Sequence, residues 1–153
     1  SMIEIPVSTA VTDTAPVVDS DCSVRAAACH LRDPEVPAVV VRDSPGEIDG
    51  IVTESDVVAI VAEGGFSHSV ASCMSSPVVT VRPSTPVGLA ADRMRDVGIT
   101  LLAVVDEDDE YHGLVTRDSL APYLSRQRLG ITWNGDPLAL DEESADAESP
   151  DAA

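Results

Sequence analysis

Lysine is absent from this sequence, and aromatic residues are scarce. All nine cationic side chains are arginines, and they face 27 acidic residues, which gives a formal net charge of −18. Nucleic acids and anionic membranes are bound through clusters of basic side chains, and the sequence contains no such cluster. We therefore expect neither a nucleic-acid partner nor a membrane partner. Because only 3% of the residues are aromatic, the core must consist of Val, Ala, Leu and Ile.

The acidic excess has two interpretations. The first is adaptation to a salt-rich cytoplasm, where dissolved ions screen the repulsion between carboxylates. The second is an ordinary acidic protein whose charge is inflated by its tail. Residues 141–153 contain six acids and no base, which leaves 21 acids against nine arginines in the rest of the chain. The tail does not explain the whole excess, so we favour the halophilic interpretation.

Cysteine pairs and long apolar runs are also missing. The cysteines Cys22, Cys29 and Cys73 are odd in number and form no C-x-x-C motif, which argues against a disulfide framework and against a zinc site. No apolar run has the length of a membrane span, and no signal-peptide pattern opens the chain. We expect a cytoplasmic protein without a bound metal.

The sequence does contain an internal repeat. Residues 7–58 align with residues 70–121 without a gap, and 13 of the 52 aligned pairs are identical. A corner motif recurs, as Gly50-Ile51-Val52-Thr53 in the first half and Gly113-Leu114-Val115-Thr116 in the second. We interpret each corner as a strand end, a tight glycine turn and a helix start, where unpaired N–H groups favour an anionic or polar ligand.

Hydrophobic periodicity and turn residues predict the order β-α-β-β-α in both halves, and hence an α+β fold of two pseudo-symmetric repeats. In the first half the expected strands and helices span residues 17–18, 23–32, 36–42, 47–52 and 54–63. In the second half they span residues 78–81, 86–96, 99–105, 110–115 and 117–127.

No catalytic set is recognised. His30, His68 and His112 occupy unrelated positions of the repeat, and none has the spacing of a metal ligand. No serine lies in a G-x-S-x-G elbow, and no glycine-rich phosphate loop of the Walker or Rossmann type is found. We therefore do not expect an enzyme.

The repeated motifs resemble the cystathionine-β-synthase (CBS) domain family, in which two tandem repeats form a Bateman module packed sheet to sheet. The matching stretches are Val17-Val18, Val39–Asp43 and Gly50–Asp56 in the first half, and Pro77–Val81, Leu102–Asp106 and Gly113–Thr116 in the second. The expected division is a first CBS repeat at 5–65, a linker at 66–69, a second repeat at 70–128, an extension at 129–136 with Trp133, and an acidic, disordered tail at 137–153.

The resemblance implies two clefts for an adenosine-containing ligand, namely AMP, ADP, ATP or S-adenosylmethionine, and no catalytic cofactor. The motif Thr would contact a phosphate, the Asp three residues later would accept both ribose hydroxyls, and apolar residues of the other repeat would flank the adenine. Carried over, site one comprises Val17, Thr53, Asp56, Ile99, Leu101 and Ala103. Site two comprises Val36, Ala38, Val40, Thr80, Thr116, Arg117, Asp118 and Ser119.

The two expected sites are unequal. Site two has Ser119 at the ribose position, and its acid is Asp118, about 100° of helix rotation away. A hydroxyl accepts fewer hydrogen bonds than a carboxylate, so site one is expected to be the better ribose site. An alternative stays open, because Thr53 and Asp56 also fit a capping box that needs no ligand.

Cations that could hold several phosphates are few. Only Arg117 and Arg82 are candidates, and the surrounding charge is strongly negative. The sequence therefore favours AMP, adenosine or the cationic S-adenosylmethionine over a triphosphate.

Two functions remain open. One is a sensor that binds an adenosyl ligand and signals to an unknown partner, and the other is an assembly module with no physiological ligand. The family resemblance implies head-to-head or head-to-tail dimers through the terminal helices. The helices expected at 54–63 and 118–127 carry apolar residues beyond the needs of one internal face, so we expect a homodimer.

Melting in low and in multimolar salt tests the halophilic interpretation. Screening of the 27 acids should raise the melting temperature as salt increases. Differential scanning calorimetry in 0.1 M and 3 M KCl (about 10 Å and under 3 Å Debye length, respectively) gives the measurement. Equal melting temperatures in both would contradict the interpretation.

Overall fold

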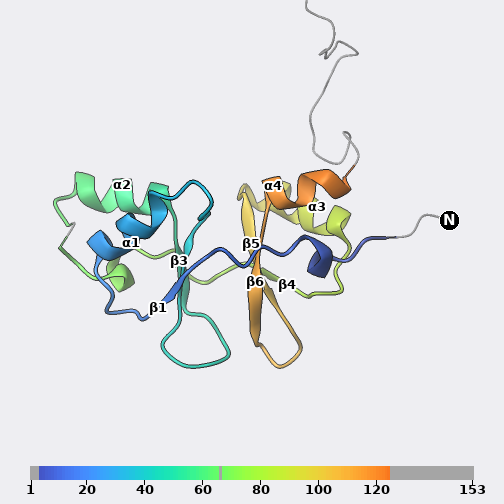
Figure 1. The fold of residues 1–153 in the computed structure, drawn as a ribbon, viewed down its shortest axis with the longest axis horizontal. Coiled ribbons are helices and arrows are strands. Elements are labelled where there is room, and N and C mark those ends of the chain that lie inside the picture. Colours follow the sequence, from blue (N-terminus) through green and yellow to red (C-terminus); the bar gives the residue numbers. More distant parts are fainter. Residues whose placement is uncertain (1–3, 66, 125–153) are drawn as a thin grey trace, which may run out of the picture. The chain divides into compact units, whose positions relative to one another are not determined.

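The computed structural model describes residues 4–65 and 67–124 of the chain (Figure 1). The first half comprises β1 (Val17–Val18), α1 (Val24–Leu31), β2 (Val39–Val41), β3 (Gly50–Val52) and α2 (Glu54–Ala62). The second half comprises β4 (Thr80–Val81), α3 (Val87–Val97), β5 (Leu101–Val105), β6 (Tyr111–Thr116) and α4 (Arg117–Leu120). Three 3-10 helices complete the set, η1 (Val7–Ala10), η2 (Val70–Ser72) and η3 (Ala121–Tyr123). The expected β-α-β-β-α order is confirmed in both halves.

Each half forms its own three-stranded sheet, ordered β1-β2-β3 and β4-β5-β6. In both sheets the first two strands are parallel and the last two are antiparallel. A helix crossover joins the parallel pair, as parallel strands require. Helices α1 and α2 pack together beside the first sheet, and α3 and α4 pack together beside the second (Figure 1).

The central strand β2 shows how the layers are filled. Successive side chains of a strand point to opposite faces, and Val39, Val40 and Val41 are all fully buried. Val39 and Val41 belong to the core beneath α1, whereas Val40 belongs to a cluster that includes Ala103 of β5. The expected packing of sheet against sheet is therefore present, and β2 has no face in water.

The segment that leads into the first strand of each half runs along the sheet of the other half. The chain before β4 runs beside β3, where Ser75 N–H donates to the carbonyl of Ile51 at 2.8 Å and Ile51 N–H donates back at 3.2 Å. The chain before β1 runs beside β6, where Thr12 and Leu114 form the same pair of bonds at 2.8 and 3.2 Å. We call residues 73–79 and 10–16 the crossing segments, because each joins the sheet of one half to that of the other.

The glycines of the two corners serve this crossing. Gly50 and Gly113 lie inside β3 and β6, so the tight glycine turn expected at each corner is wrong. A Cβ at Gly50 would lie 2.5 Å from Sδ of Met74, and a Cβ at Gly113 would lie 2.5 Å from Val11 Cγ1. Only glycine leaves room for the crossing segment at these strands.

Some element bounds differ from the expected ones. The strand expected at 47–52 begins at Gly50, and the helix expected at 117–127 ends as an α-helix at Leu120. Pro122 has no N–H to continue the helix, and the chain passes into the 3-10 helix η3. The rest of that expected helix, the extension with Trp133 and the acidic tail lie outside the described residues.

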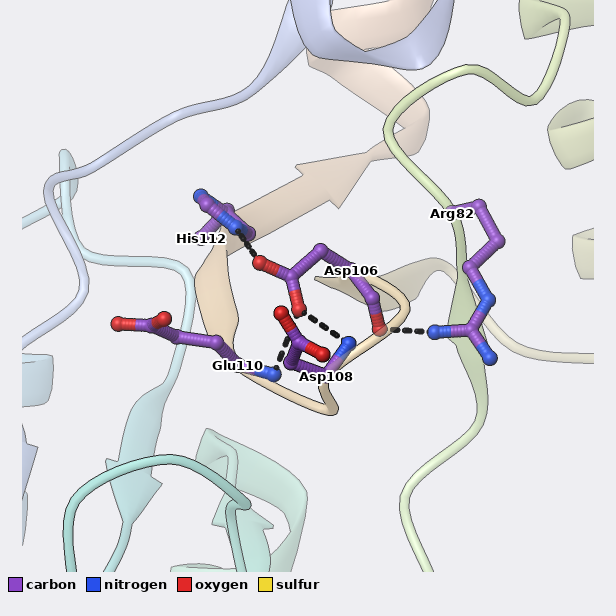
Figure 2. Close-up of polar contacts among 5 residues, drawn as sticks. All are labelled: Arg82, Asp106, Asp108, Glu110 and His112. Atoms are coloured by element: carbon purple, nitrogen blue, oxygen red, sulfur yellow. Dashed lines mark hydrogen bonds and ion pairs between the residues drawn. The ribbon is translucent and has the colours of Figure 1, made fainter.

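The turn between β5 and β6 is organised by one carboxylate, Asp106 (Figure 2). Its Oδ1 accepts the N–H groups of Asp108 and Glu110 at 2.8 and 3.0 Å, and its Oδ2 lies 2.7 Å from Nε2 of His112. Its backbone carbonyl accepts from Arg82. The His112 hydrogen bond and these N–H groups hold the pKa of Asp106 below its ordinary value, so the side chain is an ionised turn cap.

Alanine substitutions at the two corner glycines test the crossing. Gly113 has a φ of 130°, and a Cβ there would also approach the backbone oxygen of Thr12 at 3.0 Å. Gly113→Ala should therefore lower the free energy of unfolding by about 2 kcal/mol or more. Gly50→Ala should cost less, because the flexible Met74 side chain can move. Urea unfolding of both variants measures the difference, and a larger loss at Gly50 would contradict the expected order.

Candidate functional site

A cavity of about 370 Å³ lies at the first corner, where β3 and α2 meet the crossing segment of residues 73–79 and the loop from α3 to β5. We call it the first cleft. Its lining residues are Ile51, Thr53, Ser55, Asp56, Ser75, Pro77, Val78, Val79, Gly98, Ile99, Thr100 and Leu101. Both halves contribute, so the cleft exists only when the two halves are folded together.

Local sequence explains how Thr53 and Asp56 are presented. Thr53 has extended backbone angles, φ −113° and ψ 174°, and is the N-cap of α2, so Asp56 lies at the third helical position. Oδ2 of Asp56 accepts the N–H of Thr53 at 3.0 Å and its hydroxyl at 3.1 Å. The capping box expected as an alternative is thus present. It uses Oδ2 of Asp56 and leaves Oδ1 without a capping contact, and Asp56 lines the cleft.

Ser75 supplies a further contact to the same carboxylate. Its hydroxyl lies 3.2 Å from Oδ1 and 3.4 Å from Oδ2 of Asp56, and its backbone forms the bridge to Ile51. The start of α2 is therefore tied to the crossing segment by a side chain as well as by the backbone. Sequence reasoning missed this contact, because Ser75 and Asp56 are 19 residues apart and belong to different repeats.

Apolar side chains from two segments form walls of the first cleft. Ile99 and Leu101 come from the α3–β5 connection, and Val78 and Val79 come from the crossing segment; all four are half-buried. Half-buried aliphatic side chains in a cavity give an apolar surface against which a planar ring can pack. Ile99 and Leu101 lie where site one was expected to have them.

Two residues expected in site one do not line the first cleft. Val17 pairs with Val40 in the first sheet and is 43% exposed, and the place expected for its backbone is taken by Pro77, Val78 and Val79. The first cleft is instead lined by leading residues of the other half, and the role of Val17 stays a prediction. Ala103 is fully buried in the cluster between the sheets and cannot reach a ligand.

The second corner is built differently. Thr116 is the N-cap of α4, its Oγ1 accepts the N–H of Ser119 at 2.9 Å, and Ser119 Oγ accepts the N–H of Thr116 at 2.9 Å. Ser119 Oγ also donates to the carbonyl of Thr116 at 3.2 Å, so its hydroxyl proton is used locally. Asp118 and Arg117 are exposed on the first turn of α4.

The remaining residues expected in site two are scattered. Ala38 and Val40 are fully buried between the sheets, and Val36 packs against the core of the first half. Thr80 pairs with Ala103 in the second sheet. Ala38 and Val40 are therefore too deeply buried to touch a ligand, and the other residues of site two stay a prediction.

A hydrogen bond also ties the crossing segment near the second corner. Thr14 Oγ1 donates to the carbonyl of Glu35 at 2.8 Å and lies 3.0 Å from Thr12 Oγ1. The equivalent residues at the first cleft are Pro77 and Gly98, neither of which has a side-chain hydroxyl, and both line the cavity. The two corners therefore differ at the rim as well as at the ribose position.

The charge of the first cleft is negative. Asp56 is the charged member of its lining, and none of the described residues that line it is Arg or Lys. Burial and then the charge of Asp56 raise the pKa of the neighbouring Cys73 thiol, so that thiol stays protonated and poorly nucleophilic at neutral pH. The cleft is suited to binding a polar or cationic group.

A second cavity of about 420 Å³ lies near the hairpin turns and is lined by both polar and apolar residues. Its lining includes Glu47, Asp49 and Asp109, together with Thr80 and Val105. Among the described residues, no group of three His, Cys, Asp or Glu side chains has the geometry of a metal site. None of the helices in the described ranges is long and apolar enough to cross a membrane.

Comparison with known proteins identifies the fold and its family. The family model of the CBS domain matches residues 7–63 and again residues 70–126. The chain belongs to the CBS domain family. The described structure is thus a CBS pair, whose two repeats are interlocked by the crossing segments.

Similar proteins include enzymes and ligand-bound CBS pairs. L-aspartate semialdehyde sulfurtransferase of Methanosarcina acetivorans is 39% identical over 88 residues, which are 58% of this chain and 17% of that enzyme. A CBS domain protein of Pyrobaculum aerophilum complexed with AMP is 26% identical with a TM-score of 0.70, over 82% of this chain and 95% of that one.

A third similar protein is a CBS domain pair in complex with 5′-methylthioadenosine and S-adenosyl-L-methionine. It is 22% identical with a TM-score of 0.71, over 79% of this chain and 96% of that one, a likeness that shows the fold. The chain spans a quarter or less of the first curated relatives, with shares of 17%, 25% and 22%. Its matches to enzymes therefore cover only their CBS portions.

Proposed function

We propose that this CBS pair is a regulatory module that senses an adenosine-containing metabolite in the first cleft and signals to a partner protein. The observation that carries the proposal is the convergence of Asp56 with two aliphatic walls in one cavity. Similar CBS pairs bind AMP, 5′-methylthioadenosine and S-adenosylmethionine, which supports the ligand class. The adenine lies between the walls, and the ribose hydroxyls donate to Asp56.

The electrostatics of the first cleft favour a ligand with few or no phosphates. A phosphate needs hydrogen-bond donors or cations, and the lining offers no cationic side chain within the described residues. The Thr53 hydroxyl donates to Asp56, so a phosphate oxygen would compete with that carboxylate for the same proton. A neutral adenosyl group or the cationic S-adenosylmethionine meets the negative potential of Asp56 without this competition.

Calorimetric titration with S-adenosylmethionine, adenosine, AMP and ATP tests the proposed function. The wild type should bind the first two more tightly than ATP. Asp56→Ala removes the acceptor of both ribose hydroxyls and should weaken binding by about tenfold or more, since hydrogen bonds to charged groups contribute roughly 1.5–3 kcal/mol each.

Glu54→Ala is the matched control for that titration. Glu54 is an exposed acid on the first turn of the same helix, and the lining of the first cleft does not include it. Its removal changes the charge equally and should leave the affinity close to that of the wild type. Equal affinities of the wild type and Asp56→Ala would refute the assignment of the ribose site, and preference for ATP would refute the electrostatic argument.

An assembly role through α2 is the second candidate, and it is compatible with the first. Within residues 4–65 and 67–124 this helix contributes no fully buried side chain, although it is rich in valine. Val58 is 68% exposed and Val61 is 47% exposed. An apolar helix face in water is the expected surface for a second copy of the chain, and it coincides with one of the helices expected in the dimer.

Sedimentation of a charged variant tests the assembly role. Val58→Glu places a carboxylate in the centre of the α2 face. The wild type should sediment as a dimer and this variant as a monomer. Leu89→Glu is the matched control, because Leu89 is 58% exposed on α3 and lies outside the proposed contact. A monomeric wild type, or a dimer that only Leu89→Glu disrupts, would exclude α2 as the interface.

A further inference from the structure

The carboxylate of Asp56 is almost fully used by the protein itself. An ionised carboxylate has about four positions for hydrogen-bond donors, two on each oxygen. Oδ2 accepts the N–H and the hydroxyl of Thr53, at 3.0 and 3.1 Å, and these two donors fill it. Oδ1 accepts the hydroxyl of Ser75 at 3.2 Å, which leaves about one position for a ligand.

A ribose presents two adjacent hydroxyls, so it requires one more position than Asp56 has open. The two bonds from Thr53 hold the start of α2 and come from the same capping turn. The bond from Ser75 is longer, it is shared between the two oxygens at 3.2 and 3.4 Å, and Ser75 is exposed. Water can satisfy its hydroxyl after displacement, so Ser75 is the donor that leaves at the smallest cost.

We propose that the Ser75 hydroxyl is a built-in competitor for the ribose, held on Asp56 by the crossing segment and displaced when a cis-diol ligand binds. This inference rests on the proposed function of the first cleft and names the residue that sets its affinity for a diol. Ser75 is thus a specificity-determining residue, because its hydroxyl lowers the affinity for ligands with two ribose hydroxyls and leaves the affinity for ligands with one hydroxyl unchanged.

Displacement of Ser75 also changes a contact between the halves. Ser75 belongs to the crossing segment, and Asp56 belongs to α2, which carries the apolar face proposed for assembly. Binding of a diol removes the side-chain link between them, whereas the backbone bridge of Ser75 to Ile51 remains. At the second corner the aligned residues are Thr12 and Ser119, and each is engaged in a different bond, Thr12 with Thr14 and Ser119 with Thr116. The competitor is thus a feature of the first cleft.

Binding of adenosine and 2′-deoxyadenosine to Ser75→Ala, measured by calorimetry, tests this role. Ser75→Ala should bind adenosine about two- to tenfold more tightly than the wild type, which corresponds to one ordinary hydrogen bond. Its affinity for 2′-deoxyadenosine should be unchanged, because a single hydroxyl fits the open position beside Ser75. Ser75→Thr keeps the hydroxyl and should bind both ligands like the wild type.

Ser72→Ala is the matched control, because Ser72 is exposed in η2 and its hydroxyl donates to the carbonyl of Ser69, away from Asp56. Weaker adenosine binding by Ser75→Ala would overturn the competitor role and leave the proposed function standing. So would an equal gain for adenosine and for 2′-deoxyadenosine. Failure of both the wild type and Ser75→Ala to bind adenosine would overturn the proposed function, and this inference with it.

Discussion

The backbone bridge between Ile51 and Ser75 is the contact on which the first cleft depends. Its two hydrogen bonds, at 2.8 and 3.2 Å, fix the chain that leads into the second sheet against the last strand of the first. This position brings Val78 into the cleft that Ile99 also lines, and it places Ser75 on Asp56. The equivalent bridge from Thr12 to Leu114 ties the chain that leads into the first sheet to the last strand of the second.

Much of the fold follows from sequence, because local rules and tertiary packing agree. The apolar run of β2 marks a strand buried on both faces, and Ser23 caps α1 by accepting the N–H of Ala26 at 3.0 Å. The corner threonine Thr53 begins a helix whose third residue returns to the cap, as its spacing predicts. These features depend on neighbours within a few residues, and the buried strand and the capping box recur in the second half.

The cleft assignments fail where they depend on residues distant in the chain. A repeat that aligns without a gap is symmetric under exchange of its halves, so the alignment cannot tell whether Val17 or Val79 serves Thr53. The crossing brings Val79 to the first cleft, and Gly50 leaves room beside β3 for the Met74 side chain. The family resemblance implies a wall position for Ala103, but its full burial follows from the first sheet, which packs on it.

The two corners therefore differ in more than the residue at the equivalent positions Asp56 and Ser119, because their hydrogen bonds also differ. At the first corner the Thr53 hydroxyl donates to its acid, and the acid retains a position for a ligand. At the second corner the Thr116 hydroxyl accepts an N–H, and the Ser119 proton returns to the backbone. One carboxylate thus caps α2, holds the crossing segment and lines the cleft, so the ligand proposed for it must compete with the protein's own contacts. A residue used in this way couples binding to the junction of the two halves, which is the property that a regulatory module requires.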